Sequence, residues 1–131
     1  RWHHRLADLF LDTFIFSAGT RSILSLYAGL PILTMLGSIP QSRLGAEMCN
    51  AMSMPELVVH SIDEYIEKAI HLSKNHFEVE NMKHKILKNR NQSYLFNQKE
   101  FIKNLEKGYL CIYQNYEHLG TTKHFDIEGA T

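Results

Sequence analysis

One short segment combines the residue types that bind anions. It consists, in chain order, of Ser17, Ala18, Gly19, Thr20 and Arg21. Gly19 permits close approach of the backbone, and the N–H groups of residues 20–22 begin a predicted helix whose dipole attracts negative charge. A diphosphate would fit there. A simple helix-capping loop has the same composition, so the residues alone leave both interpretations open.

A second segment of the same kind spans residues 37–43 and also leads into a predicted helix. It begins with Gly37, contains Pro40 and Ser42, and ends with the cation Arg43. Ligands of open α/β sheets bind beyond the carboxyl ends of strands, where such loops lie. The residues favour a structural role for this loop, with contact between Arg43 and a ligand as the alternative.

Metal and nucleophile chemistry find little support in the residue spacing. Of the eight histidines only His3 and His4 are neighbours, and no HExxH, Gly-x-Ser-x-Gly or Walker sequence occurs. Cys49 and Cys111 lie far apart in apolar helical patterns, which predicts two buried thiols in a reducing compartment. We therefore assign neither a metal ligand nor a catalytic residue in this chain.

Three short apolar runs are typical of buried parallel strands. They span residues 9–11, 31–36 and 57–59. The first two each precede one of the two loops described above. Asp12 ends the first run, and Thr20 is placed to N-cap a helix that ends at Gly29. The order strand, loop, helix, strand is that of a βαβ unit.

Four helices are predicted after the second strand. The first lies before the third strand, and the other three follow it. Ser42 is expected to N-cap the first, and Ser61 with Glu64 forms a capping box for the second. The second helix carries an apolar stripe made of Ile62, Tyr65, Ile66, Ala69 and Ile70. A third contains Val79, Met82 and Ile86, and a long final helix from Gln98 carries Phe101, Ile102, Leu105, Tyr109, Ile112, Tyr113 and Tyr116.

Alternating strands and helices in the first 75 residues require a parallel sheet covered by helices. Three strands make a thin sheet with a free edge, so we interpret the chain as the C-terminal part of a larger Rossmann-like domain. The fold class is α/β, with a short parallel sheet followed by C-terminal helices. The apolar stripe of the last helix further predicts self-association of the isolated chain, as a homo-oligomer.

Composition excludes several function classes for these 131 residues. Lys and Arg number 14 and so do Asp and Glu, so the chain lacks the positive field that nucleic-acid binding requires. The longest apolar stretch, residues 22–35, is shorter than the roughly 20 residues that span a membrane. Residues 83–107 are locally basic, which indicates a solvated helix face or, alternatively, an acidic partner.

Residues 4–13, 18–20, 27–34, 42–43 and 55–58 closely resemble the C-terminal catalytic lobe of family 41 glycosyltransferases. This is the O-linked N-acetylglucosamine transferase and SPINDLY-like group. The resemblance continues at Glu64, Tyr65, residues 93–97, Phe101, Leu105, Glu106 and Tyr109. It therefore covers nearly the whole chain, from His4 to about Tyr116.

The resemblance implies a GT-B fold, in which two Rossmann-like lobes hold a nucleotide sugar in the cleft between them. It implies a cytoplasmic enzyme that transfers an N-acetylglucosamine-like sugar, without a bound metal, from a UDP-linked donor to Ser or Thr of proteins. Residues 1–119 would form the C-terminal half of the donor-binding lobe, and residues 120–131 a flexible tail. The protein acceptor would bind through missing N-terminal parts, so the isolated fragment is expected to be inactive.

The donor loop departs from the family pattern, which usually reads Asn-Gly/Ala-His-Thr-Thr with an Asp three residues later. Those places hold Ser17, Ala18, Gly19, Thr20, Arg21 and Leu24. Thr20 retains the hydroxyl and N–H expected to contact the diphosphate, and Arg21 adds a positive charge. Leu24 replaces the Asp that meets the ribose. One consequence would be a donor other than UDP-N-acetylglucosamine. The alternative function is a noncatalytic protein-interaction module with a degenerate donor site.

Overall fold

The computed structural model describes residues 6–120, without the side chain of Leu119. His3 and His4 lie outside these residues, and so does the predicted tail apart from Gly120. The chain divides into two compact units, Arg1–Ser93 and Tyr94–Thr131.

The first unit contains the parallel sheet that the sequence predicts. Its described strands are β1 (Phe10–Leu11), β2 (Ile32–Met35) and β3 (Val58–Val59), in the order β1-β2-β3. Phe10 pairs with Ile32, and Thr34 pairs with Val58. The α/β class is confirmed, but each strand is shorter than the apolar run that predicts it. In β3 the reason is that Leu57 ends a 3₁₀ turn, Pro55–Leu57, instead of entering the sheet.

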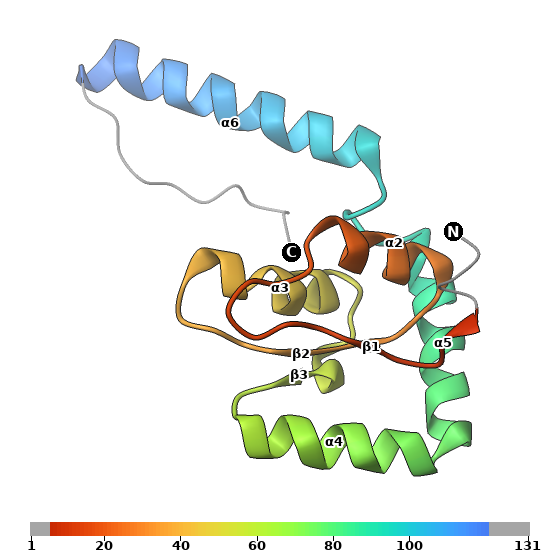
Figure 1. Ribbon diagram of the computed structural model, residues 1–131. Coiled ribbons are helices and arrows are strands. Elements are labelled where there is room, and N and C mark those ends of the chain that lie inside the picture. The colour runs from red at the N-terminus through yellow and green to blue at the C-terminus, as the bar shows by residue number, and fades with distance from the viewer. Residues whose placement is uncertain (1–5, 121–131) are drawn as a thin grey trace. The chain divides into compact units, whose positions relative to one another are not determined.

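Helices cover both faces of this sheet, as Figure 1 shows. The helices α2 (Thr20–Ala28) and α3 (Leu44–Ala51) lie on one face, and α4 (Ile62–Lys74) lies on the other. The helix α5 (His76–Arg90) contacts both α4 and α2 and so closes one side of the unit. Fully buried apolar side chains from every layer fill the core, among them Leu26, Ile32, Leu33, Met52, Leu57, Leu72 and Ile86.

The predicted apolar stripe of α4 is only partly correct. Tyr65 is buried and packs with Leu33 and Val59 of the sheet. Ile62, Ile66 and Ile70 remain 55%, 49% and 50% exposed. The reason is geometric: the narrow sheet covers only the helix face that carries Tyr65, and Ile62, Ile66 and Ile70, spaced four residues apart, share a neighbouring face.

Two of the predicted helix starts are shifted by one residue. Gly19, and not Thr20, is the N-cap of α2, with φ 51° and ψ −111°, a conformation that glycine adopts without steric cost. Arg43 is the N-cap of α3, because Ser42 ends a 3₁₀ turn, Pro40–Ser42. The Ser42 hydroxyl instead donates to the carbonyl of Ile39 at 2.9 Å, so the prediction that Ser42 caps this helix is wrong.

The capping of α4 agrees with its sequence. The Ser61 hydroxyl accepts a hydrogen bond from the N–H of Glu64 at 3.2 Å. The returning bond differs from a standard capping box, because the Glu64 carboxylate accepts from the N–H of His60 at 2.8 Å. Two N–H groups at the start of α4 are satisfied in this way.

The second unit consists of α6 (Gln98–Leu119) with the residues that lead into it. Its predicted stripe is present, and every member of the stripe is at least 43% exposed. Cys111 is half-buried on this helix, whereas Cys49 of the first unit is fully buried, so the prediction of two buried thiols holds for Cys49 alone. None of the described helices is both long and apolar enough to cross a membrane. Self-association stays a prediction.

Candidate functional site

The two loops singled out from the sequence meet at the carboxyl edge of the sheet. The first follows β1 and leads into α2, and the second follows β2 and leads into α3. The N–H of Ser17 donates to the carbonyl of Gln41 at 3.0 Å, which joins them directly. Carboxyl ends of parallel strands are where ligands of α/β sheets bind, so the candidate site lies here.

Asp12 holds the first loop in place through its side chain. The carboxylate is 4% exposed, and its Oδ1 accepts from the N–H groups of Thr13 at 3.0 Å and Ala18 at 2.8 Å. Its Oδ2 accepts from the hydroxyls of Ser17 at 2.6 Å and Thr34 at 2.9 Å. Four donors converge on one buried carboxylate, which satisfies the requirement that a buried charge be hydrogen-bonded.

Two further elements press against Asp12. A Cβ added to Gly45 would overlap both Asp12 Oδ2 and Thr34 Oγ1, so the first turn of α3 packs directly on the carboxylate. The positive end of that helix dipole stabilises the negative charge. From α4, the Tyr65 hydroxyl donates to the backbone carbonyl of Asp12 at 2.9 Å. Burial, together with the charge of Asp12, raises the pKa of Tyr65 to about 12.

The sequence pattern predicts Asp12 only as the end of a strand, and its role in holding the loop is evident only in the structure. A signal was available, because an acidic residue placed directly after a fully apolar run, with Ser and Thr near it, is suited to bond loop N–H groups. What could not be read from the sequence is that Thr34 and Gly45 meet the same carboxylate.

The predicted donor residues divide into supporting and exposed ones. Ser17 is buried, with its hydroxyl on Asp12 and its N–H on Gln41, so it builds the loop. Ala18 and Gly19 are half-buried, and Thr20 and Arg21 are exposed at the start of α2. In the first loop, the structure thus presents to solvent the Thr20 hydroxyl and the Arg21 guanidinium, groups that are able to bind a diphosphate.

The N–H groups at the start of α2 only partly match the expectation. The N–H of Arg21 donates to the carbonyl of Ala18 at 3.1 Å, so it does not face outward as predicted. The N–H groups of Thr20 and Ser22 have no acceptor among residues 6–120. The Ser22 hydroxyl is fully buried and likewise lacks a described partner. This helix end therefore retains hydrogen-bonding capacity that the described protein does not use.

Arg43 and Leu24 complete the set of positions taken from the sequence. Arg43 is exposed, and its N–H is engaged by the carbonyl of Pro40 at 3.1 Å. Leu24 is 41% exposed and lies one turn after Thr20 on the same face of α2. The position that the resemblance associates with the ribose is thus beside the candidate anion site, and here it carries an apolar side chain.

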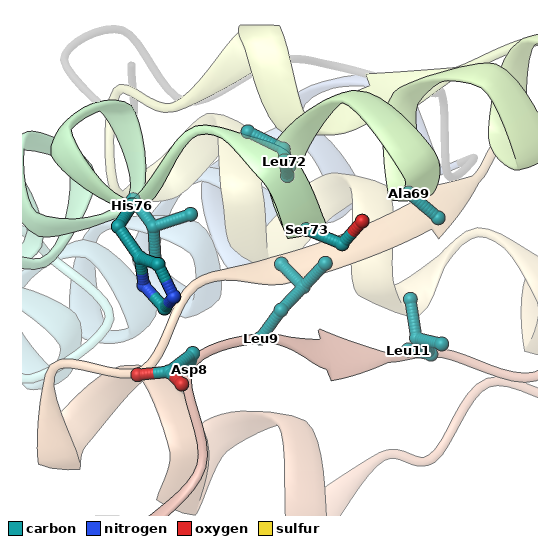
Figure 2. Close-up of a pocket in the computed structure, with 8 residues that line it drawn as sticks. Asp8, Leu9, Leu11, Ala69, Leu72, Ser73 and His76 are labelled. Carbon is teal, nitrogen blue, oxygen red and sulfur yellow. The ribbon is translucent and has the colours of Figure 1, made fainter.

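A groove of about 410 Å³ lies elsewhere, between β1 and the helices α4 and α5. Figure 2 shows Leu9 and Leu11 of the first strand region facing Ala69 and Ser73 of α4, with Asp8 and His76 at one end. None of the predicted donor residues lines this groove. It marks the uncovered side of the first strand and is separate from the candidate site.

Several charged groups elsewhere on the first unit form ion pairs at its surface. Lys83 contacts Asp8 and Glu80, both at 2.8 Å, and Lys85 contacts Glu56 at 2.7 Å, so part of the basic segment serves ion pairs within this unit. In the described part of the chain no three His, Cys, Asp or Glu side chains gather as a metal site would require. The acidic partner for residues 83–107 stays a prediction.

Residues 2–105 match the sequence profile of a family described as Glycosyl transferase family 41. A probable UDP-N-acetylglucosamine–peptide N-acetylglucosaminyltransferase SPINDLY from Solanum lycopersicum is 30% identical over 113 residues, which are 86% of this chain and 12% of that relative. The UDP-N-acetylglucosamine–peptide N-acetylglucosaminyltransferase of Caenorhabditis elegans is also 30% identical over 113 residues, 86% of this chain and 10% of that protein.

A solved structure is similar as well. It is a mutant of the Thermobaculum terrenum O-GlcNAc transferase, with a TM-score of 0.73 and 25% identity, matched over 78% of this chain and 20% of that one. The chain therefore spans about a tenth to a fifth of the length of the proteins it matches.

Proposed function

The chain belongs to glycosyltransferase family 41, and from this premise we propose that it forms the nucleotide-sugar-binding part of a protein O-glycosyltransferase. The full-length protein would transfer an N-acetylglucosamine-like sugar from UDP to Ser or Thr of a protein acceptor. Relatives named as UDP-N-acetylglucosamine–peptide N-acetylglucosaminyltransferases support this proposal. Because those relatives are much longer, the isolated chain is expected to transfer no sugar.

The observation that carries the proposal is the open start of α2 at the carboxyl edge of the sheet. Thr20 and Arg21 are exposed there, and the N–H of Thr20 has no acceptor in the described part of the chain, whereas Ser22 is fully buried. A diphosphate at this place would receive a backbone N–H, a hydroxyl and a guanidinium. Arg43, at the start of α3, is an exposed cation at the same edge of the sheet, and contact between Arg43 and the ligand is the alternative to a structural role.

These groups fit the charge changes of sugar transfer. The acceptor hydroxyl attacks the anomeric carbon and loses its proton, while the bond from that carbon to the diphosphate oxygen breaks. The leaving diphosphate takes the electron pair and gains negative charge. Donors fixed around that charge, here Thr20 and Arg21, stabilise the transition state more than the bound donor, and one such donor is typically worth about 10²–10³ in rate.

The altered donor loop favours a second candidate, a noncatalytic protein-interaction module. Leu24 stands where the family has the Asp that meets the ribose, and its exposed side chain cannot form a hydrogen bond. Gly19 likewise lacks the imidazole of the family histidine. A site without these groups would bind donor weakly, and the fold would then serve contacts with other proteins.

Titration calorimetry of the intact protein with UDP, GDP and their sugars separates the two functions. Micromolar to millimolar binding that depends on Arg21 supports the glycosyltransferase. If none of these nucleotides binds, the interaction module is favoured. A cytoplasmic location accords with the proposal, because Cys49 and Cys111 are both free thiols.

A further inference from the structure

We infer that Asp12 is a positioning residue, whose buried carboxylate fixes the loop that presents the start of α2 to the donor. The inference rests on the proposed function, since it assigns to Asp12 the geometry of that same site. Asp12 does not itself touch the donor in this proposal. It acts through Ala18 and Ser17, which it holds at 2.8 Å and 2.6 Å.

A short chain of hydrogen bonds connects Asp12 to the candidate ligand groups. Its Oδ1 accepts from the N–H of Ala18, and the carbonyl of Ala18 accepts from the N–H of Arg21 at 3.1 Å. Gly19 and Thr20 lie between these two bonds. Movement of Ala18 therefore moves both the backbone N–H of Thr20 and the stem of Arg21.

Asp12 is itself held by three separate elements, so it is a fixed reference for the loop. Its N–H donates to the carbonyl of Leu33 at 3.0 Å in the sheet, and its carbonyl accepts from Tyr65 of α4. The first turn of α3 packs on its Oδ2 at Gly45. A carboxylate suits this position because it accepts several hydrogen bonds and offers no competing donor.

The rest of the loop supplies less anchorage. Ile15 and Phe16 are 83% and 64% exposed, so apolar burial of these side chains contributes little. The other described contacts are the edge-to-face packing of Phe14 on Tyr65 and the hydroxyl of Thr13 on the carbonyl of Phe16. The backbone of Ser17 is also bonded to Gln41. Most of the loop's polar contacts nevertheless converge on the Asp12 carboxylate.

The test compares Asp12→Ala, Asp12→Asn and a control, Ile86→Ala, in the intact protein. Ile86 is fully buried in α5, far along the chain from the loop, and its truncation lowers stability without touching the carboxylate. Two quantities are measured for each folded variant: amide hydrogen exchange of residues 13–21 without ligand, and the Kd for UDP by calorimetry.

We expect Asp12→Ala to speed exchange of residues 13–21 at least tenfold more than that of residues 76–90, and to raise the Kd for UDP at least tenfold. Asp12→Asn keeps an acceptor for the N–H groups, and the hydroxyls of Ser17 and Thr34 can rotate to accept from its amide. Its Kd should therefore stay within about threefold of the parent value. Ile86→Ala should lower the melting temperature and leave the Kd unchanged.

Unchanged local exchange in Asp12→Ala, or a loss of UDP affinity equal to that of Ile86→Ala, would overturn the inference. If the parent protein binds no UDP while Asp12→Ala still loosens residues 13–21, the proposed function fails and the hold of Asp12 on the loop stands. Should Asp12→Ala not fold, Thr34→Val removes one hydroxyl from the carboxylate and leaves the loop sequence intact. It should give the same two changes at smaller size, and their absence would refute the role of Asp12.

Discussion

The loop after β1 and the loop after β2 look alike in sequence but differ in how they use their backbone N–H groups. The second loop closes on itself: Ser42 N–H donates to Ile39 at 3.0 Å, Arg43 N–H to Pro40 at 3.1 Å and Gly37 N–H to Ser42 at 3.3 Å. The first loop is held from outside, by the carboxylate of Asp12.

This difference changes which N–H groups each loop leaves for a ligand. In the second loop the N–H groups of residues 37, 42 and 43 are already engaged by carbonyls of the same loop, so these three cannot bind an anion. In the first loop the anchor is a buried side chain, and the N–H of the exposed Thr20 at the following helix start has no acceptor in the described part of the chain. A Gly or Ser before a predicted helix is therefore weak evidence for a phosphate site until the partners of those N–H groups are known.

The largest effect is expected for Gly45→Ala, which attacks the anchor of the first loop. An added methyl would overlap Asp12 Oδ2 and Thr34 Oγ1, and such overpacking costs about 3 kcal/mol at its upper end. Alanine in a helix gains at most about 1 kcal/mol over glycine, so the clash prevails. Urea unfolding of the intact protein should show a loss of about 2 kcal/mol or more. An unchanged midpoint would mean that α3 does not press on the carboxylate.

The second prediction compares the two loops through their arginines. Arg21→Ala should weaken UDP binding by roughly 1.5–3 kcal/mol, because a charge-assisted hydrogen bond to the diphosphate is lost. Arg43→Ala, at the start of α3, should change the affinity by less than about 0.5 kcal/mol, as expected for an exposed residue away from the ligand. Calorimetry on both variants provides the comparison. Equal losses would place both loops around the ligand.

A third prediction concerns the bond from α4 to Asp12. Tyr65→Phe removes the hydroxyl that the Asp12 carbonyl accepts, and should cost about 1 kcal/mol of unfolding free energy. The pKa of Tyr65 is raised from 10.0 to about 12, so its folded form keeps the proton longer than its unfolded form. The stability from this group is complete below pH 10 and is lost as the pH rises toward 12.

The pKa of Cys49 shifts in the same direction, since burial raises it from 9.0 to about 12. Cys49 therefore adds to the loss of unfolding free energy above pH 9. In Tyr65→Phe the fall of unfolding free energy with rising pH should consequently be shallower between pH 10 and pH 12 than in the parent. Denaturant titrations at several alkaline pH values measure both slopes. Identical slopes would show that Tyr65 is not buried against Asp12.

Much of this fold could be predicted from the sequence because its signals are local. Apolar runs bounded by Gly, Pro or Asp locate the three strands, and the Ser61 cap marks the start of α4. The site was harder, because the partners of Asp12 come from elements distant in the chain. Whether Ser42 caps a helix or closes a turn also depends on the tight packing of Gly37 on its side chain, which no local pattern shows.

The smallest expected effect belongs to Leu24→Asp, which restores the family residue. Leu24 is 41% exposed, so the exchange should change the unfolding free energy by less than about 0.5 kcal/mol. Restoring an acceptor for a ribose hydroxyl should tighten UDP-sugar binding by about 1 kcal/mol, or roughly fivefold.

The control is Leu24→Asn, which accepts a hydrogen bond without a charge and thereby separates ribose recognition from repulsion between the carboxylate and the diphosphate. A gain for Asn but not for Asp would mean that residue 24 is close enough to the diphosphate for its charge to matter. No gain for either, in a protein that binds UDP through Arg21, would mean that the ribose lies away from this face of α2. The first loop would then bind the diphosphate alone, and its specificity for the nucleotide would come from residues outside α2.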